Sequence, residues 1–383
     1  MKRKIRMGMV GGGKDAFIGA VHRMAARLDG QIDLVCGAFS SDAEKSKASG
    51  AEMFVPEERV YGSYKDMFEK EKALPNDVRM DFVSIVTPNF MHYPVAMAAL
   101  DAGFHVVCDK PMTLNLEEAK SLSDKVKSTG LLFCLTHNYT GYPMVKQARE
   151  MVSKGDIGKI RRVVVEYPQG WMASLLEESG QKQAAWRTDP AKSGASFIMG
   201  DIGSHCANLA EYITGLQIER VCADLTSFVP GRSLDDDGSV LLRFNDNAKG
   251  VLWASGIAVG EENALNIRVY GEKGSLEWHQ QEPNTLIVHW IDRPTQILRT
   301  STGFVGVAAS ANTRLPAGHP EGFIEAFANL YRDFAQKLTL WLDGEKSAVC
   351  DFPDAADGVR GMAFIEAVVS SSKLDSKWTK VGQ

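Results

Sequence analysis

Short runs of apolar residues alternate with stretches of helical spacing through the first third of the chain. The apolar runs predict buried strands over Ile5–Val10, Ile32–Phe39, Phe82–Val86, Val106–Cys108 and Leu131–Leu135. The helical spacing predicts helices over Phe17–Leu28, Met91–Ala102 and Leu116–Ser128. Strands with near-continuous apolar residues, alternating with helices, are typical of a parallel, doubly wound sheet. We therefore expect an α/β domain of this kind over residues 1–136.

The remaining chain has a different pattern, in which strand-like segments follow one another across turns. They are Ile160–Tyr167, Val221–Phe228, Ser239–Phe244, Gly250–Ser255, Leu265–Tyr270 and Thr285–Trp290. Strands in series favour a mostly antiparallel sheet. Helices are expected over Gly200–Thr214, Gly322–Leu340 and Ala355–Ser372. We expect residues 137–383 to form a second α/β domain with a large open sheet, and the C-terminal helix to pack back on the first domain.

An open sheet with apolar residues on both faces needs two covers. Helices can cover one face, and self-association is a natural cover for the other. The sequence therefore predicts a homodimer or homotetramer and leaves the choice between them open.

Composition and charge narrow the class of protein. The chain has 383 residues with 44% hydrophobic and 24% charged residues and a net charge of -5, which argues against a nucleic-acid-binding surface. No segment is long enough to span a membrane, and the first apolar stretch breaks at Gly11, too early for a secretory signal. We expect a cytoplasmic protein. Its six cysteines contain no C-x-x-C pair and are expected to be buried, reduced thiols.

A glycine-rich turn follows the first predicted strand and precedes the first predicted helix. Gly11, Gly13 and Ala16 satisfy the pattern G-x-G-x-x-A, which allows a dinucleotide pyrophosphate to approach the N-terminus of a helix. Phe17 and Ile18 complete the predicted phosphate loop. A longer turn is equally compatible with the sequence, with Gly19 as the third glycine.

The end of the second predicted strand should contact the adenosine ribose. The position where an acid would bind the ribose diol is Ser40. Ser40 and Ser41 can donate to a 2′-phosphate, and Lys45 follows one helical turn later. The cofactor is therefore NAD or NADP, with NADP favoured. In an alternative interpretation, Asp42 has no role in cofactor binding and is simply the N-cap of a helix.

Two further loops follow strands of the predicted parallel sheet. Thr87, Pro88 and Asn89 come directly after one strand, and His92 follows three residues later. We expect these residues at the nicotinamide end of the cofactor, although His92 could simply open a helix. Asp109 and Lys110 follow the next strand, at the edge where such folds place their chemistry.

A carboxylate and an imidazole stand four residues apart at Asp201 and His205. On a helix this spacing places both side chains on one face. Asp201 could then orient His205 and stabilise its charge, leaving the other ring nitrogen to move a proton. Together with a bound dinucleotide, Lys110 and this pair could oxidise a secondary alcohol: the dinucleotide would accept the hydride and His205 the proton. In the alternative reading, Asp201 is an N-cap and His205 a structural histidine.

Broad or polar-tipped residues are candidates for contact with the substrate. All seven tryptophans lie from Trp171 onward, which fits a domain that binds the apolar face of a sugar ring as well as it fits core packing. Arg187 carries a fixed guanidinium that suits hydroxyl-rich or carboxylate substrates. The candidates beside Lys110, Asp201 and His205 are Asn138, Tyr139, Tyr142, Trp171, Arg187 and His319. The His and Cys residues lack metal-ligand spacing, so no metal is expected.

Three motifs in order resemble the Gfo/Idh/MocA oxidoreductases, the relatives of glucose-fructose oxidoreductase and inositol dehydrogenase. They are V-T-P-N-F-M-H from Val86, C-D-K-P from Cys108 and G-D-I-G-S-H from Gly200. The family usually has E-K-P where this chain has D-K-P. Trp186 and Arg187 also look like the family and are expected on the cofactor side. The segment R-L-P-A-G-H-P-E-G from Arg314 is less usual and suggests a distinct subgroup.

The resemblance implies a Rossmann domain followed by an α/β domain whose open sheet forms the oligomer interface. It also implies NAD(P)-linked dehydrogenation or reduction at CH–OH groups of sugars, inositols or related polyols. By similarity, the catalytic residues of the family match Lys110, Asp201 and His205. Two alternatives remain. One is a non-catalytic dinucleotide-sensing regulator, and the other is an NAD-dependent glycosidase that oxidises its sugar transiently.

Overall fold

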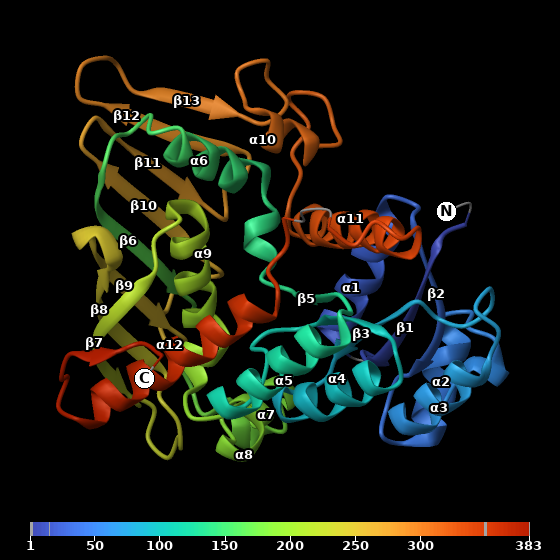
Figure 1. Cartoon of the computed structure of the whole chain (residues 1–383). Coiled ribbons are helices and arrows are strands. Elements are labelled where there is room, and N and C mark those ends of the chain that lie inside the picture. Colours follow the sequence, from blue (N-terminus) through green and yellow to red (C-terminus); the bar gives the residue numbers. More distant parts are fainter. Residues whose placement is uncertain (1–2, 15, 348–350, 383) are drawn as a thin grey trace. The chain divides into compact units, whose positions relative to one another are not determined.

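The computed structural model describes residues 3–14, 16–347 and 351–382, and these fall into two compact units (Figure 1). Unit 1 contains the residues through Asn138 together with Phe327–Val359. Unit 2 contains Tyr139–Ala326 and the residues from Arg360 onward. Each unit is built around a sheet of its own.

Unit 1 is built on a parallel sheet of five strands among the described residues, in the order β2-β1-β3-β4-β5. The strands are β1 (Ile5–Gly11), β2 (Ile32–Ala38), β3 (Phe82–Val86), β4 (His105–Cys108) and β5 (Phe133–Leu135). Every residue of β3 and β4 is buried, as expected for strands covered by helices on both faces. The structure confirms the predicted parallel, doubly wound sheet.

The helices of unit 1 are α1 (Phe17–Leu28), α2 (Ala43–Glu52), α3 (Tyr64–Ala73), α4 (His92–Asp101), α5 (Leu116–Thr129) and, from Phe327 onward, α11 (Phe323–Leu342). The hydrophobic pattern did not predict α2 or α3. The buried face of α2 is made of Ser46, Ser49 and Gly50, small residues that leave no apolar stripe in the sequence. Right-handed crossovers place α1 on one face of the sheet and α4 and α5 on the other.

Unit 2 is built on a nine-stranded sheet, counted over the described residues, in the order β13-β12-β11-β10-β6-β9-β8-β7-β14. Its strands are β6 (Ile160–Pro168), β7 (Ile218–Thr226), β8 (Asp237–Phe244), β9 (Lys249–Ser255), β10 (Asn266–Gly271), β11 (Gly274–His279), β12 (Thr285–Trp290), β13 (Gln296–Arg299) and β14 (Thr379–Lys380). The β6–β9 pair is parallel and the other pairs are antiparallel. The predicted open, mostly antiparallel sheet is confirmed. The sequence pattern missed β11, β13 and β14.

The helices of unit 2 are α6 (Pro143–Ser153), α7 (Lys182–Arg187), α8 (Pro190–Ser193), α9 (Ser204–Thr214), α10 (Val307–Ala311) and, from Arg360 onward, α12 (Ala355–Lys373). Helices α6 and α9 pack on each other and on the sheet (Figure 1). Ser371 of α12 accepts a hydrogen bond from Ala223 N of β7 at 2.9 Å. One face of the sheet is thus covered by helices, while Leu241 on β8 points to the opposite face and is 47% exposed.

A buried polar set joins α11 to α1 and β3 inside unit 1. The Tyr331 hydroxyl lies 2.7 Å from His22 Nδ1 and 2.8 Å from Ser84 Oγ. All three side chains are buried. The two hydroxyls and His22 Nδ1 find partners in one another, which offsets the cost of burying them, whereas His22 Nε2 has none among the described residues.

The described residues contain no helix long and apolar enough to cross a membrane. Cys36, Cys108, Cys134 and Cys206 are buried, Cys222 is half-buried, and these five cysteines form no disulfide among the described residues. The sixth cysteine, Cys350, lies outside the described residues.

Buried histidines make the stability of unit 1 depend on pH. Burial lowers the pKa of His22 and of His105 to about 4 and that of His137 to about 3, from an ordinary value of 6.5. The unfolded chain therefore binds more protons than the folded one between about pH 4 and 6.5. Asp235 of unit 2 has the opposite effect, because burial raises its pKa to about 6.

We expect the free energy of unfolding to fall as the pH is lowered from 7 to 5. Each buried histidine contributes a slope of up to about 1.4 kcal/mol per pH unit below its unfolded pKa, and the single carboxyl of Asp235 offsets only part of it. Urea denaturation at the two pH values measures the change. Asp235→Asn removes the offset and should steepen the loss. Equal or greater stability at pH 5 would contradict the assignment of these histidines as neutral in the folded state.

Candidate functional site

A tight glycine turn at the end of β1 forms a short stretch of backbone that carries no side chains. Gly11 and Gly12 have φ angles of 79° and 68°, which favour glycine. A Cβ on Gly11 would lie 2.7 Å from Val86 O, and one on Gly13 would lie 2.7 Å from Phe39 O. This turn therefore excludes side chains from the surface that faces the N-terminus of α1.

The packing of α1 on the turn favours the longer of the two glycine registers. A Cβ on Gly19 would lie 2.4 Å from Gly12 Cα and 2.6 Å from Gly12 O. Gly19 is thus the glycine that lets α1 pack against the turn, which is the role of the third glycine in a dinucleotide fingerprint. Ala16 is instead the N-cap position of α1. Arg23, which sequence reasoning missed, braces the turn by donating to Gly12 O at 2.5 Å.

The N-terminus of α1 is suited to an anion. No described side chain caps it, and its first turn contains no acid. Its free N–H groups and positive dipole end are the features that bind a pyrophosphate. Phe17 at the start of the helix is 69% exposed. The residues predicted for the phosphate loop lie together here, at Gly11, Gly13, Ala16, Phe17 and Ile18.

The predicted ribose end lies after β2. Asp42 accepts from Glu44 N at 3.0 Å and Lys45 N at 3.1 Å, so it is the N-cap of α2, as one reading of the sequence allowed. Ser40 Oγ accepts from Asp42 N at 3.2 Å. Ser41 and Lys45 are exposed, and Lys45 Nζ lies 3.8 Å from the Asp42 carboxylate.

His92 connects the loops that follow β3 and β4. Its Nε2 lies 2.9 Å from Thr87 O, and its Nδ1 lies 2.7 Å from Pro111 O. Burial lowers the pKa of His92, although the two backbone carbonyls favour its charged form. His92 does open α4, but it also fixes the Thr87–Asn89 loop against the D-K-P segment.

The acid of the D-K-P segment stabilises the backbone of that segment. Asp109 Oδ1 accepts from Lys110 N and from Thr136 Oγ1, both at 2.9 Å. Both Asp109 and Lys110 are half-buried. The Thr87 Oγ1 atom is buried, with no hydrogen-bond partner among the described residues. The predicted Thr87, Pro88, Asn89, His92, Asp109 and Lys110 thus gather at the carboxyl ends of β3 and β4.

In unit 2, Asp201 and His205 lie on a helical segment that changes its winding between them. Residues Met199–Gly203 form a π-helix, and α9 begins at Ser204. The expected α-helical spacing of the two residues is therefore altered by a π turn, a feature frequent at functional sites. The winding could not be predicted because it depends on how this segment is anchored to the rest of unit 2.

Asp201 is held by the arginine that the sequence singled out. Arg187 Nε donates to Asp201 Oδ2 at 3.1 Å. The Arg187 guanidinium also lies 4.3 Å from the ring centroid of Trp186. Arg187 and Asp201 are about one fifth exposed, so this ion pair is partly shielded from water.

His205 is buried among aromatic rings. Its side chain belongs to a residue that is 6% exposed, and its ring meets Tyr139 edge-on with 4.7 Å between centroids. Tyr142 is also buried, stacks on Tyr139 and contacts Trp278. Both tyrosines are therefore part of the packing around His205.

The other predicted substrate contacts differ in exposure. Trp171 is half-buried, and its Nε1 donates to Gln169 Oε1 at 2.9 Å. His319 is exposed, with Nδ1 3.2 Å from Pro316 O. Asn138 of unit 1 is buried, and its Nδ2 has no hydrogen-bond partner within the described part of the chain.

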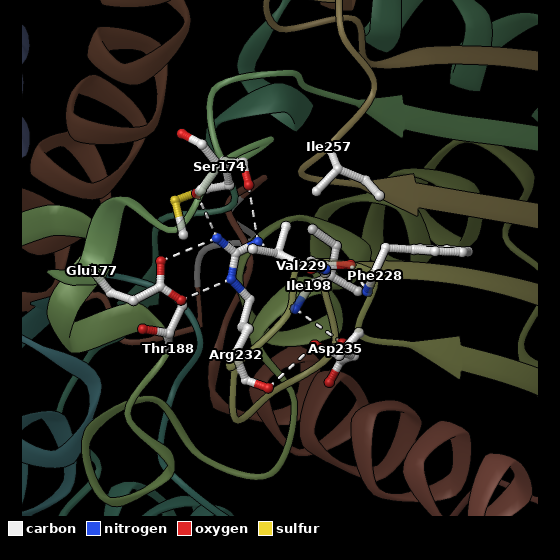
Figure 2. A network of polar contacts seen from close by, with 12 residues as sticks. Ser174, Glu177, Thr188, Ile198, Phe228, Val229, Arg232, Asp235 and Ile257 are labelled. Carbon is white, nitrogen blue, oxygen red and sulfur yellow. Dashed lines mark hydrogen bonds and ion pairs between the residues drawn. The ribbon is translucent and has the colours of Figure 1, made fainter. Parts of the chain in front are cut away.

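A buried arginine joins the loops around the Asp201–His205 segment (Figure 2). Arg232 donates to Glu177 at 2.8 and 3.0 Å, to Met172 O and Ser174 O at 2.9 Å, and to Asp236 at 3.0 Å. Its side chain is fully buried. The loop after β6, which carries Trp171, is thereby fixed to the β7–β8 connection.

Asp235 continues this network toward the candidate acid–base residues. Its carboxylate accepts from Ser196 Oγ at 2.7 Å and from Ile198 N at 3.2 Å (Figure 2). These contacts lie directly before the π-helix that carries Asp201. Asp235 therefore stabilises the N-terminal end of that helical segment, and no motif in the sequence points to it.

Comparison with known proteins covers both units. Residues 5–139 match the oxidoreductase family with an NAD-binding Rossmann fold, and residues 145–277 match the GFO/IDH/MocA C-terminal domain. The uncharacterized oxidoreductase YfiI of Bacillus subtilis is 34% identical, over 99% of this chain and 98% of that protein. The levoglucosan dehydrogenase of Pseudarthrobacter phenanthrenivorans is 25% identical, over 100% and 99% respectively.

Solved structures agree with these relatives. An inositol dehydrogenase homologue from Azotobacter vinelandii, complexed with NAD+, is 35% identical with a TM-score of 0.95. The same homologue complexed with NADH and myo-inositol is 34% identical with a TM-score of 0.93. Both alignments cover 99% of this chain and 98% of the other.

We expect Gly19→Ala to weaken dinucleotide binding at least about tenfold, because its Cβ forces α1 away from the turn at Gly12. The overpacking should also lower the free energy of unfolding by about 1–3 kcal/mol. Calorimetric titration with NAD+ and urea denaturation measure the two effects. Gly361→Ala is the matched control, since a Cβ there meets nothing within 4 Å. Unchanged NAD+ binding by the Gly19 variant would show that the longer turn is not the phosphate loop.

Proposed function

The chain belongs to the Gfo/Idh/MocA family of oxidoreductases, and we propose that it transfers hydride between a nicotinamide dinucleotide and a secondary alcohol of a cyclic polyol. The observation that carries this proposal is the presence of two complementary halves in one chain. Unit 1 has a glycine turn beside an uncapped helix. Unit 2 has a buried imidazole and a carboxylate on one helical segment.

The bare turn and the uncapped N-terminus of α1 fit the pyrophosphate of the dinucleotide. Its nicotinamide, when bound, accepts or donates the hydride. We propose that the phosphate loop runs from Gly11 to Gly19. The Thr87–Asn89 loop, His92, Asp109 and Lys110 hold the nicotinamide end, and Trp186 and Arg187 complete the cofactor site.

The proton of the alcohol is assigned to His205. In the oxidative direction His205 accepts the hydroxyl proton, while Lys110 donates a hydrogen bond to the developing alkoxide. Asp201 stabilises the imidazolium that forms, and Arg187 holds Asp201 in place. A positioned base of this kind typically contributes about 10²- to 10⁴-fold to the rate.

A cyclic polyol suits the remaining side chains. We propose that Trp171 offers its ring face to the apolar side of the substrate, and that Asn138, Arg187 and His319 bind its hydroxyl groups. Tyr139 and Tyr142 line the inner side of this region. The relatives named for inositol and levoglucosan support a ring-shaped substrate with adjacent hydroxyls.

The two units have different proposed roles. We assign dinucleotide binding to unit 1 and substrate binding and self-association to unit 2. Leu241 and Tyr270 are exposed apolar residues on the open sheet face, where a second copy of the chain would cover them. A homodimer or homotetramer is the assembly that this face supports.

The ribose end accommodates a 2′-phosphate. No acid occupies position 40, so no carboxylate there would repel a phosphate or select the ribose diol. The carboxylate of Asp42 is engaged as the N-cap of α2, and the Lys45 ammonium is exposed. We propose that NADP is used at least as efficiently as NAD.

Initial rates with the two cofactors test this preference. We expect Lys45→Glu to lower kcat/KM for NADP about tenfold through charge repulsion and to leave kcat/KM for NAD within about twofold. Lys47→Glu on the same helix is the control, because Lys47 pairs with Glu57. A wild-type preference for NAD above tenfold would overturn the assignment of Ser40, Ser41 and Lys45.

The function itself is tested by a spectrophotometric screen of sugars, inositols and anhydrosugars with NAD and NADP. With the substrate found, His205→Ala should lower kcat at least about a hundredfold while NADH binding, followed by fluorescence, is retained. Cys206→Ala, the next residue on the same helix, is the matched control and should keep its activity.

Three outcomes would refute parts of this proposal. Wild-type turnover by His205→Ala would remove the base from the mechanism. Tight cofactor binding without turnover of any polyol would indicate a dinucleotide-sensing regulator. Glycoside cleavage without net release of NADH would indicate an NAD-dependent glycosidase.

A further inference from the structure

The His205 ring is oriented by two tyrosines of unit 2. Tyr139 meets it edge-on, with 4.7 Å between centroids and planes 82° apart. Tyr167 lies on it at 6.3 Å between centroids and 54° between planes. Edge-to-face packing has a preferred geometry, so the place of Tyr139 determines the direction in which the imidazole points.

The hydroxyl groups of these tyrosines form a closed ring with Asn263. Tyr167 donates to Asn263 Oδ1 at 2.7 Å, and Asn263 Nδ2 donates to the Tyr139 hydroxyl at 3.2 Å. The two hydroxyls are hydrogen-bonded to each other. Because the single proton of Tyr167 is directed at Asn263, Tyr139 donates to Tyr167. Each hydroxyl in the ring therefore donates once and accepts at least once.

The orientation of the Asn263 amide has only one solution. Asn263 Oδ1 also accepts from Gln169 Nε2 at 2.6 Å. The Gln169 amide is itself oriented, because its Oε1 accepts from Trp171 Nε1, a group that can only donate. A reversed Asn263 amide would therefore direct its NH2 group at the NH2 group of Gln169. Burial raises the pKa of Tyr139 to about 12 and raises the pKa of Tyr167 well above its ordinary value. Both hydroxyls therefore keep their protons at neutral pH and the ring stays closed.

The ring unites segments that are far apart in the sequence. Tyr139 lies in the 3-10 turn Asn138–Gly141, Tyr167 lies near the end of β6, and Asn263 lies in the connection from β9 to β10. Gln169 extends the set to Trp171, because Gln169 Oε1 accepts a hydrogen bond from Trp171 Nε1 at 2.9 Å. The loop that carries a proposed substrate contact is thus bonded to the side chains that flank His205.

Resting on the proposed role of His205 as the base, we propose that Tyr139, Tyr167 and Asn263 are positioning residues for its imidazole. They hold the ring at the angle at which it receives the proton. Asn263 is the decisive member, because removing its amide leaves the proton of the buried Tyr167 hydroxyl without its acceptor and the Tyr139 hydroxyl without its amide donor. Its loss should affect turnover rather than binding of the dinucleotide.

The experiment uses the full chain and two substitutions. Asn263→Leu removes the amide at similar volume, and Tyr167→Phe removes one hydroxyl while keeping the aromatic ring beside His205. We expect kcat to fall about 10- to 100-fold, as for a misplaced reacting group, with the NADH dissociation constant unchanged within about twofold. Tyr331→Phe is the matched control, since it removes a buried hydroxyl with two partners in unit 1.

A double substitution separates positioning from general damage. In the His205→Ala background, Asn263→Leu should lower kcat no further, because the group it positions is gone. A merely structural role would lower kcat by the same factor in both backgrounds. Myo-inositol is the probe substrate, with levoglucosan as the second.

A readout that needs no substrate completes the test. Diethyl pyrocarbonate modifies accessible imidazoles, and mass spectrometry of the peptide that holds His205 gives its rate of modification. We expect this rate to rise at least about threefold in Asn263→Leu and Tyr167→Phe as the packing on the buried imidazole loosens, and to stay unchanged in Tyr331→Phe. Wild-type kcat and wild-type modification rates in both ring variants would overturn the inference, while an inactive His205→Ala would leave the proposed function standing.

Discussion

The guanidinium of Arg232 directs its N–H donors at carboxylate and carbonyl oxygens inside unit 2. A buried charge persists only when its hydrogen bonds are made within the protein, and this requirement fixes the loop after β6, which carries Trp171, against the β7–β8 connection to which Arg232 belongs. Asp235 of the same connection accepts from Ser196 Oγ and Ile198 N, directly before the π-helix that leads to His205. The candidate chemistry of unit 2 is therefore presented by a scaffold whose loops cannot move independently without exposing an unpaired charge.

The same requirement operates in unit 1, with backbone groups in place of a central arginine. His92 links the loops that follow β3 and β4 by facing two carbonyl oxygens, and Asp109 accepts from the Lys110 amide. Both arrangements hold loops at the carboxyl ends of parallel strands, where such sheets bind their ligands. At the neighbouring turn, the close approach of Gly19 to Gly12 adds a packing constraint to the hydrogen bond from Arg23. It keeps the helix N-terminus next to a backbone free of side chains.

The buried imidazole of His205, the proposed base, packs against aromatic side chains. Aromatic edges surround its ring, and the carboxylate on the same helical segment is engaged by Arg187. The tyrosines that pack on the imidazole are in turn fixed by an amide whose orientation has one solution. The side chains that pack on the imidazole are thus connected to the loop of Trp171 by hydrogen bonds, through groups that stay protonated at neutral pH.

The sequence by itself determined the two kinds of sheet, the glycine turn and the candidates Lys110, Asp201 and His205, because hydrophobic period and motif spacing are local properties. Helix α2 escaped prediction since its buried face is made of small polar residues. Only the tertiary structure decided that Gly19 packs on the turn, that Arg187 holds Asp201, and that Asn263 joins Tyr139 to Tyr167. The last contacts connect residues 124 and 96 positions apart. Such pairings depend on which strands become neighbours, and no window of the sequence contains that information.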